Sequence, residues 1–185
     1  MRAICGRIRC CGERSRAGCD NGRGYSYSAA HDAARVPAAM PPHSGSSIDK
    51  EEIARFDALA AGWWQPDGAM APLHRLNPCR LGYLRERLTA HFDLDPDARR
   101  PFHGLRILDV GCGGGVLSEP MARLGGDVAG VDAAAEAIEV ARAHAAQGSL
   151  KIDYSCGTAE DLVGSGVQFD VVIASEIVEH VADPP

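Results

Sequence analysis

Apolar residues recur along this chain at two different spacings, and the alternation of the two predicts its secondary structure. Short apolar runs predict buried strands at residues 105–110, 127–131, 150–154 and 169–174. Helical spacing in the intervals predicts helices at residues 115–124 and 133–147, with a short helix after residue 157 and another at 176–181. Strands that alternate with helices predict an α/β fold built on a parallel, doubly wound sheet.

Two helices are expected before the first strand. The first begins at Ser47 or Asp49, either of which can cap it, and ends near Gly62. For the second, Asn77 is the expected N-cap and Pro78 the first-turn proline. Four apolar residues then follow at helical spacing: Leu81, Leu84, Leu88 and Phe92. Both helices are expected to flank or cover a site at the strand ends that follow, with Trp63 and Trp64 as packing residues.

The first 47 residues show no apolar period and are rich in Gly, Ser, Arg and Pro, so we expect a disordered leader. Two explanations stay open. Met40 is the true start and the preceding residues are over-translated, or the arginine-rich stretch is a mitochondrial transit peptide.

Charge is divided unevenly along the 185 residues. Seven arginines against three acids give residues 1–39 a net charge of +4, so residues 40–185 carry −10 and the whole chain −6. An acidic body without a basic cluster argues against nucleic acid as a partner. No 18-residue apolar run predicts a membrane span. The cysteines show neither the paired spacing of a zinc site nor the pattern of a disulfide framework. Their arrangement therefore suits a reducing compartment.

A glycine turn follows the first predicted strand and is the strongest candidate for ligand binding. Asp109, Gly111, Gly113 and Gly115 form an acid-x-Gly-x-Gly-x-Gly pattern. Bare backbone at such a turn lets N–H groups approach a ligand. The dinucleotide-binding fingerprint requires a glycine or alanine where Val116 stands, so it does not fit. The pattern resembles motif I of class I S-adenosylmethionine-dependent methyltransferases, where Asp109 would face an ammonium and a sulfonium.

Acidic residues also follow the second and third predicted strands. Asp132 lies where a carboxylate can accept both ribose hydroxyls of a nucleoside, although it can equally cap the next helix. Glu160 and Asp161 lie where such folds contact an adenine, and a solvated helix start explains them as well.

Glu176, Glu179 and His180 are spaced to share one face of a helix after the fourth predicted strand. Two carboxylates and one imidazole suit Mg²⁺, which could chelate adjacent hydroxyls of an aromatic substrate and lower their pKa. Two alternatives stay open. The acids complement the helix N-terminus, or His180 is a general base without metal.

Several segments together resemble the ubiquinone biosynthesis O-methyltransferase family. They are Ile48–Phe56, Trp63–Trp64, Pro72–Pro78, Arg80–Tyr83, Asp109–Gly115 and Ser175–Val181. The resemblance implies a Rossmann-like class I methyltransferase domain over residues 48–185, with four strands of its sheet present and the C-terminal part absent. The open edge of a four-stranded sheet gives the same expectation of a fragment.

The resemblance also implies roles for single residues. Arg80 would bind the carboxylate of S-adenosylmethionine, and Gly111 and Gly113 would lie against the cofactor. Asp132 would hold its ribose, and Ser175 would line its pocket. The Glu-x-x-Glu-His set, Glu176, Glu179 and His180, would bind Mg²⁺.

The implied acceptors are polyprenyl catechols, namely 2-polyprenyl-6-hydroxyphenol and 3-demethylubiquinol. The implied place is the bacterial cytoplasm at the inner membrane, in peripheral contact with it and with a quinone-synthesis complex. The matrix side of the mitochondrial inner membrane is the alternative if the leader is a transit peptide. Two other functions stay open: a small-molecule methyltransferase with another acceptor, and a non-catalytic cofactor-binding subunit.

Overall fold

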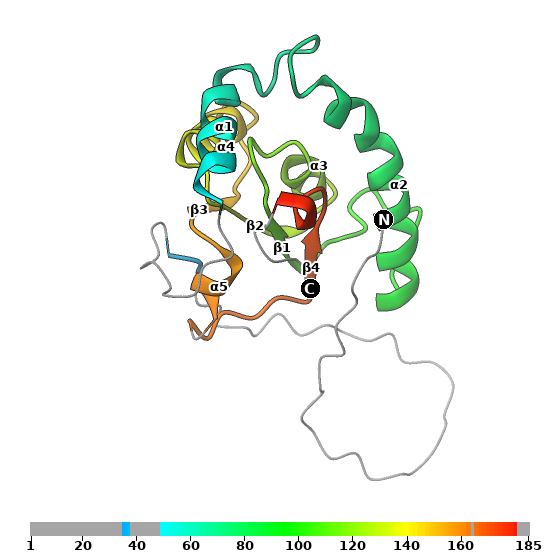
Figure 1. Ribbon diagram of the computed structural model, residues 1–185. Helices are drawn as coiled ribbons and strands as arrows, with labels where there is room; N and C mark the ends of the chain where they lie inside the picture. Colours follow the sequence, from blue (N-terminus) through cyan, green and yellow to red (C-terminus); the bar gives the residue numbers. More distant parts are fainter. Residues whose placement is uncertain (1–34, 38–48, 164, 181–185) are drawn as a thin grey trace, which may run out of the picture.

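Four short strands form one parallel sheet in the computed structural model, which describes residues 35–37, 49–163 and 165–180. The strands are β1 (Arg106–Val110), β2 (Asp127–Asp132), β3 (Asp153–Cys156) and β4 (Val171–Ala174). Their order across the sheet is β3-β2-β1-β4, so the strand order reverses at β1, with β2 and β3 on one side of it and β4 on the other (Figure 1). In such sheets ligands bind beyond the carboxyl ends of the strands at this reversal, between β1 and β4. The predicted α/β fold with a parallel sheet is confirmed.

Helices surround the sheet, and two of them precede it as predicted. The α-helices are α1 (Lys50–Leu59), α2 (Ala71–Phe92), α3 (Ser118–Arg123), α4 (Ala135–Gln147) and α5 (Ala159–Leu162). Single 3₁₀ turns are η1 (Ala60–Gly62) and η2 (Val178–His180). Figure 1 shows α1 beside α4, with α2 on the other flank. Within the described part of the chain, no helix combines the length and apolarity needed to cross a bilayer.

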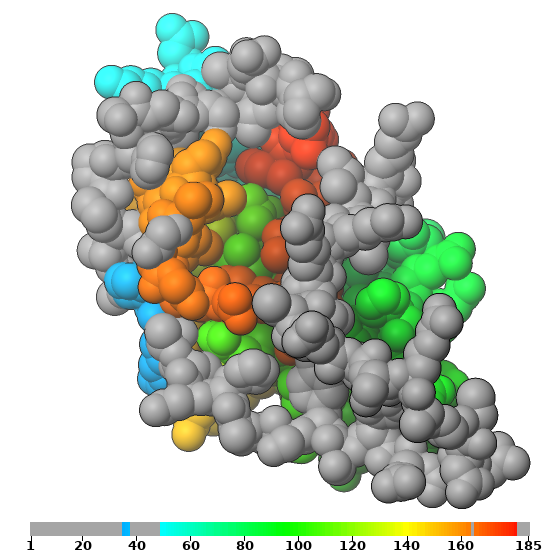
Figure 2. All heavy atoms as spheres, turned by 90° about the horizontal axis from the view of Figure 1, so that it is seen from below, coloured from blue at the N-terminus to red at the C-terminus, as the bar shows by residue number. Residues whose placement is uncertain are grey.

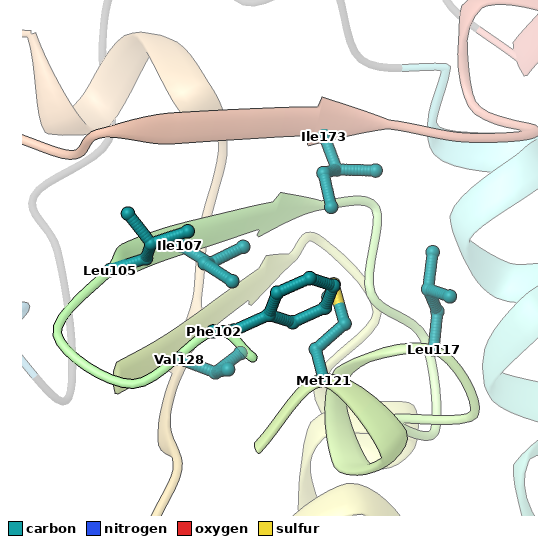
Figure 3. Close-up of a cluster of buried hydrophobic side chains, with 7 residues drawn as sticks. All are labelled: Phe102, Leu105, Ile107, Leu117, Met121, Val128 and Ile173. Carbon is teal, nitrogen blue, oxygen red and sulfur yellow. The ribbon is translucent and has the colours of Figure 1, made fainter. Parts of the chain in front are cut away.

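The main core lies on the face of the sheet that carries Ile107 and Val128. These residues are partners across β1 and β2, and both are almost fully buried. Phe102 and Met121 pack against them, both without exposed surface (Figure 3). The apolar residues of α2, namely Leu81, Leu84, Leu88 and Phe92, cover the same cluster. The apolar residues at helical spacing therefore mark the half-buried face of α2 that packs against the sheet.

Fewer apolar residues cover the opposite face of the sheet, and they include Val36 of the predicted leader. Val36 is buried against Leu108 and Leu162, and the Pro37 carbonyl accepts a hydrogen bond from Ser155. Figure 2 shows residues 35–37, in blue, beside orange residues from the later part of the chain. Val172 of β4 lies on this face and is 56% exposed. The rest of the expected leader lies outside the described residues.

The start of the second helix was predicted wrongly. The helix α2 begins at Ala71, and Asn77 lies inside it. Pro72 is the proline of the first turn, where a missing N–H costs no helical bond. Asn77 is buried and donates from Nδ2 to the Val116 carbonyl, 2.6 Å away. The residue that resembled a cap therefore ties α2 to the segment after the glycine turn.

Other boundaries also differ from the prediction by one to three residues, and two of them differ because a residue takes the left-handed conformation. Gly115 has φ +86° and Glu176 has φ +57°, and an α-helix includes neither value. Thus α3 begins only at Ser118, and the predicted helix 176–181 is a turn followed by η2, with Val181 outside the described residues. The third strand begins later than predicted because the Leu150 N–H bonds to Ala145 and closes α4.

Candidate functional site

A cavity of about 410 Å³ opens at the carboxyl ends of β1, β2 and β4, where the strand order reverses. Its walls come from the turn after β1, the ends of β2 and β4, the segment after β3, and helix α1. The volume lies in the range of small-molecule sites. All the residues predicted to bind the cofactor line it: Arg80, Asp109, Gly111, Gly113, Asp132 and Ser175.

The glycine turn has the tight geometry that its sequence predicts. Gly111 and Gly113 have φ +70° and +51°, values that a side chain disfavours. The N–H groups of Gly111 and Cys112 both bond to the Val131 carbonyl, so the turn is fastened to β2. Added Cβ atoms would collide with Trp63 at Gly113 and would lie 2.6 Å from Ile177 at Gly111. Glycine is therefore required here by both backbone conformation and close neighbours.

Asp132 joins the end of β2 to the glycine turn. Its Oδ2 accepts the Gly113 N–H, and its Oδ1 accepts the Ala134 N–H ahead of α4, both at 2.8 Å. The capping role considered for this residue is not seen, because the N-cap of α4 is Ala134 and no side chain caps the helix; Asp132 instead holds the segment just ahead of it. Each carboxylate oxygen has a second lone pair, so two ribose hydroxyls could still bind. Burial raises the pKa of this carboxyl. The ribose role stays a prediction.

Asp109 is a buried acid at the end of β1, with 3% of its surface exposed. Ser118 Oγ donates to its Oδ2 at 2.6 Å. Burial raises the pKa of Asp109 from 3.8 to about 7, against the opposing effects of the Ser118 hydrogen bond and of Arg80. A charge that is costly to bury alone favours a cation beside it. This environment suits the ammonium and sulfonium that the sequence suggested.

Arg80 brings a buried positive charge from α2 to the same cavity. Its surface is 4% exposed, and its Nη2 lies 3.6 Å from Glu176 Oε1, too far for a hydrogen bond. Neither Nε nor Nη2 has a hydrogen-bond partner among the described residues. An arginine with such donors is suited to bind a carboxylate through two parallel hydrogen bonds. The residues present therefore fit S-adenosylmethionine, with its carboxylate at Arg80.

The three predicted metal ligands are not brought together. Glu176 faces Arg80, Glu179 is exposed, and His180 Nδ1 lies 3.2 Å from Glu52 Oε2. The His180 ring also meets Phe56 edge-on, with the ring centres 5.1 Å apart. Over the described ranges, no group of three His, Cys, Asp or Glu side chains is arranged to hold a metal ion. As arranged, these residues do not fit Mg²⁺, and their metal role stays a prediction.

The two acids considered for adenine binding have different surroundings. Asp161 forms a capping box with Thr158 at the start of α5, so it has the helix-start role. Glu160 lines the cavity beside it. Only Glu160 therefore keeps a position that suits contact with an adenine.

Sequence reasoning missed the residues that lie against the glycine turn. Trp63 is 5% exposed and covers Gly113 and Gly114, and Ile177 lies over Gly111. The only signal in the sequence is the glycine run itself, which indicates that something approaches the backbone closely. It does not say which residue, because Trp63 comes from a segment fifty residues earlier.

Known proteins resemble this chain over most of its length. The family of methyltransferase domains matches residues 107–185. A ubiquinone biosynthesis O-methyltransferase from Cereibacter sphaeroides is 60% identical over 139 residues, which are 75% of this chain and 56% of that protein. One from Mesorhizobium japonicum is 57% identical over 144 residues, which are 78% of this chain and 58% of that protein.

This chain thus spans a little over half the length of these relatives. Among solved structures, the PH0226 protein from Pyrococcus horikoshii is 22% identical with a TM-score of 0.45, covering 67% of this chain and 52% of that one. The parallel sheet and the matched methyltransferase domain together show the class I methyltransferase fold.

Proposed function

This chain belongs to the ubiquinone biosynthesis O-methyltransferase family, and from that premise we propose that its protein methylates a hydroxyl of a polyprenyl catechol. The methyl donor is S-adenosylmethionine, whose sulfonium supplies an activated methyl group. The proposed acceptors are 2-polyprenyl-6-hydroxyphenol and 3-demethylubiquinol. The observation that supports the cofactor most directly is the buried Arg80 guanidinium, with unpartnered donors beside a glycine turn.

Six residues bind the cofactor in this proposal. Arg80 receives the carboxylate, and the Gly111 and Gly113 backbone lies against the aminoacyl end. The carboxylate of Asp109 faces the positive charges, which favour its ionised form. Asp132 accepts the ribose hydroxyls with the lone pairs left by its two backbone hydrogen bonds. Ser175, at the end of β4, completes the pocket wall.

His180 is the proposed base at the acceptor end. Its Nδ1 faces Glu52, so Nε2 is the ring nitrogen left to take the proton of the acceptor hydroxyl. Magnesium remains the alternative aid to that deprotonation, and it would require Glu176 and His180 to leave their present partners. The proposed proton transfer therefore uses His180 without a metal ion.

The acceptor class also implies a place for the protein. A polyprenyl chain partitions into a bilayer, so we propose that the protein works at the surface of the bacterial inner membrane, and that a quinone-synthesis complex passes the acceptor to it. The bacterial relatives support this over a mitochondrial place.

Calorimetric titration of this chain with S-adenosylmethionine tests the cofactor. We expect saturable binding and no binding of NAD. Absence of the first, or tighter binding of NAD, would overturn the proposal.

The acceptor is tested on a chimera in which the remaining part of the Cereibacter sphaeroides relative follows residue 185. We expect this chimera to methylate a short-chain demethylubiquinol in preference to a simple catechol. The intact relative is the positive control. Equal turnover of both acceptors would favour a methyltransferase of another specificity, and cofactor binding without any turnover would favour a non-catalytic subunit.

A further inference from the structure

Trp64, expected from the sequence as a packing residue, contacts the glycine turn from outside the cavity. Its neighbour Trp63 lines the cavity, whereas Trp64 is directed elsewhere. The Trp64 indole Nε1 donates to the Gly114 carbonyl at 2.9 Å. This bond joins the segment before α2 to the turn after β1, across fifty residues of sequence.

The Trp64 ring is itself held by a histidine of α4. The rings of Trp64 and His144 are stacked, with centres 3.5 Å apart and planes within 4°. His144 Nδ1 in turn lies 2.6 Å from Oε1 of Glu119, a buried carboxylate that Arg123 also contacts at 3.1 Å. Glu119 thus holds the His144 ring, and the Trp64 ring lies between this stack and the edge of His74, whose ring centre is 5.2 Å away.

The bond from Trp64 acts on a peptide group that is held from both sides. The Gly115 N–H bonds to the Cys112 carbonyl at 2.9 Å, and the Gly114 carbonyl of the same peptide bonds to Trp64. The residues on either side of this peptide are Gly114 and Gly115, and without side chains they would allow it to rotate. Gly115 has positive φ. A fixed Gly114 peptide therefore fixes the backbone that faces the cavity.

We propose that Trp64, held by its stack on His144, is a positioning residue for the cofactor turn. It keeps the Gly111–Gly115 backbone in the conformation that receives S-adenosylmethionine, which lowers the entropy lost on binding. The inference rests on the proposed function for the identity of the ligand. The ordering of the turn by Trp64 does not depend on that identity.

Two substitutions separate the hydrogen bond from the stack. Trp64→Phe removes the N–H donor and keeps an aromatic ring, while His144→Gln keeps a donor for Glu119 and removes the flat ring. Tyr83→Phe, on an exposed part of α2, is the matched control. Calorimetry gives the dissociation constant for S-adenosylmethionine, and hydrogen exchange gives the protection of the amides in residues 111–118.

Loss of one neutral hydrogen bond predicts an affinity about fivefold weaker for Trp64→Phe, with faster exchange confined to residues 111–118. His144→Gln should also weaken binding of S-adenosylmethionine. The double variant should bind about as weakly as the weaker-binding single variant, because both substitutions act through one contact. Tyr83→Phe should match the unsubstituted chain in both measurements.

A purely structural role would lower the melting temperature of Trp64→Phe and leave its affinity at 25 °C unchanged, which would overturn the inference. Unchanged exchange in residues 111–118, or additive effects in the double variant, would overturn it as well. If the unsubstituted chain fails to bind S-adenosylmethionine, the proposed function fails, and the exchange measurement still decides whether Trp64 orders the turn.

Discussion

The two sides of the cavity differ in how completely they are built. On the side of β1 and β2, backbone N–H groups, Asp132 and the turn glycines satisfy one another within adjacent strand ends. On the side of β4, Glu176 and His180 face Arg80 and Glu52, which come from helices about a hundred residues earlier. The first side presents backbone groups and a carboxylate that suit a nucleoside-bearing ligand. On the second side, the described side chains are not arranged to bind a metal ion together.

This difference follows from the range of the contacts involved. A turn between two paired strands has its partners fixed by the sheet register, so a few residues determine its geometry. The residues after β4 rely on exposed or half-buried side chains whose partners exchange at small cost. Cofactor binding is therefore expected to depend strongly on the first side and on the buried Arg80, and only weakly on the exposed residues after β4.

The largest effect is expected from Arg80→Met, which keeps most of the buried stem and removes the charge. Loss of a buried charge-assisted pair with the cofactor carboxylate predicts binding of S-adenosylmethionine about 100-fold weaker, or about 3 kcal/mol. Calorimetry measures it. Arg75→Met, on the exposed side of α2, is the matched control and should bind normally. Near-normal affinity of Arg80→Met would place the carboxylate elsewhere in the cavity.

The second effect is on stability instead of cofactor binding, through the pKa of Asp109. Its pKa is about 7 in the folded protein against 3.8 otherwise, because burial disfavours the charge. At a pH between these two pKa values, the Asp109 carboxyl is ionised in the unfolded chain and protonated in the folded protein. Raising the pH from 4 to 7 therefore lowers the free energy of unfolding, by at most about 1.4 kcal/mol per pH unit, with no further loss above 7.

Asp109→Asn should remove this part of the pH dependence, as measured by urea unfolding across the same range. The exposed Asp67→Asn is the control and should keep the slope of the unsubstituted chain. Equal slopes for Asp109→Asn and the unsubstituted chain would mean that the carboxyl ionises freely in the folded protein.

The smallest effect is expected on the other side of the cavity. Glu179 is exposed and has no ion-pair partner in the part of the chain that the structure describes. Glu179→Gln should thus change the free energy of unfolding by less than about 0.5 kcal/mol. The affinity for S-adenosylmethionine should also stay unchanged.

Turnover of the chimera with the Cereibacter sphaeroides relative provides a second test of Glu179. If the metal role suggested by the sequence holds, Mg²⁺-dependent turnover disappears in Glu179→Gln. Full turnover in EDTA would end the metal hypothesis and leave His180 as a base by itself.

The strand and turn predictions succeeded where local pattern and final structure agree. The sequence predicted the alternation of strands and helices, the glycine turn and the carboxylate at the end of β2. It could do so because apolar runs and glycines have few alternative structures. The prediction failed at Asn77 because Asn-Pro is a good cap locally, while Pro72 already supplies the helix start. It failed after β4 because nothing in the spacing of Glu176 and His180 shows the left-handed turn at Glu176.

By itself the sequence determined the parallel α/β class, the position of the ligand turn and the family, because these depend on local periodicity and on motifs. Only the tertiary structure decided that Trp63 and Trp64 hold the turn from two sides and that Asn77 is tied to Val116. It alone placed Glu176 beside Arg80 and His180 beside Glu52, with Glu179 exposed. These facts join segments far apart in the chain, and no local spacing specifies which distant side chains meet.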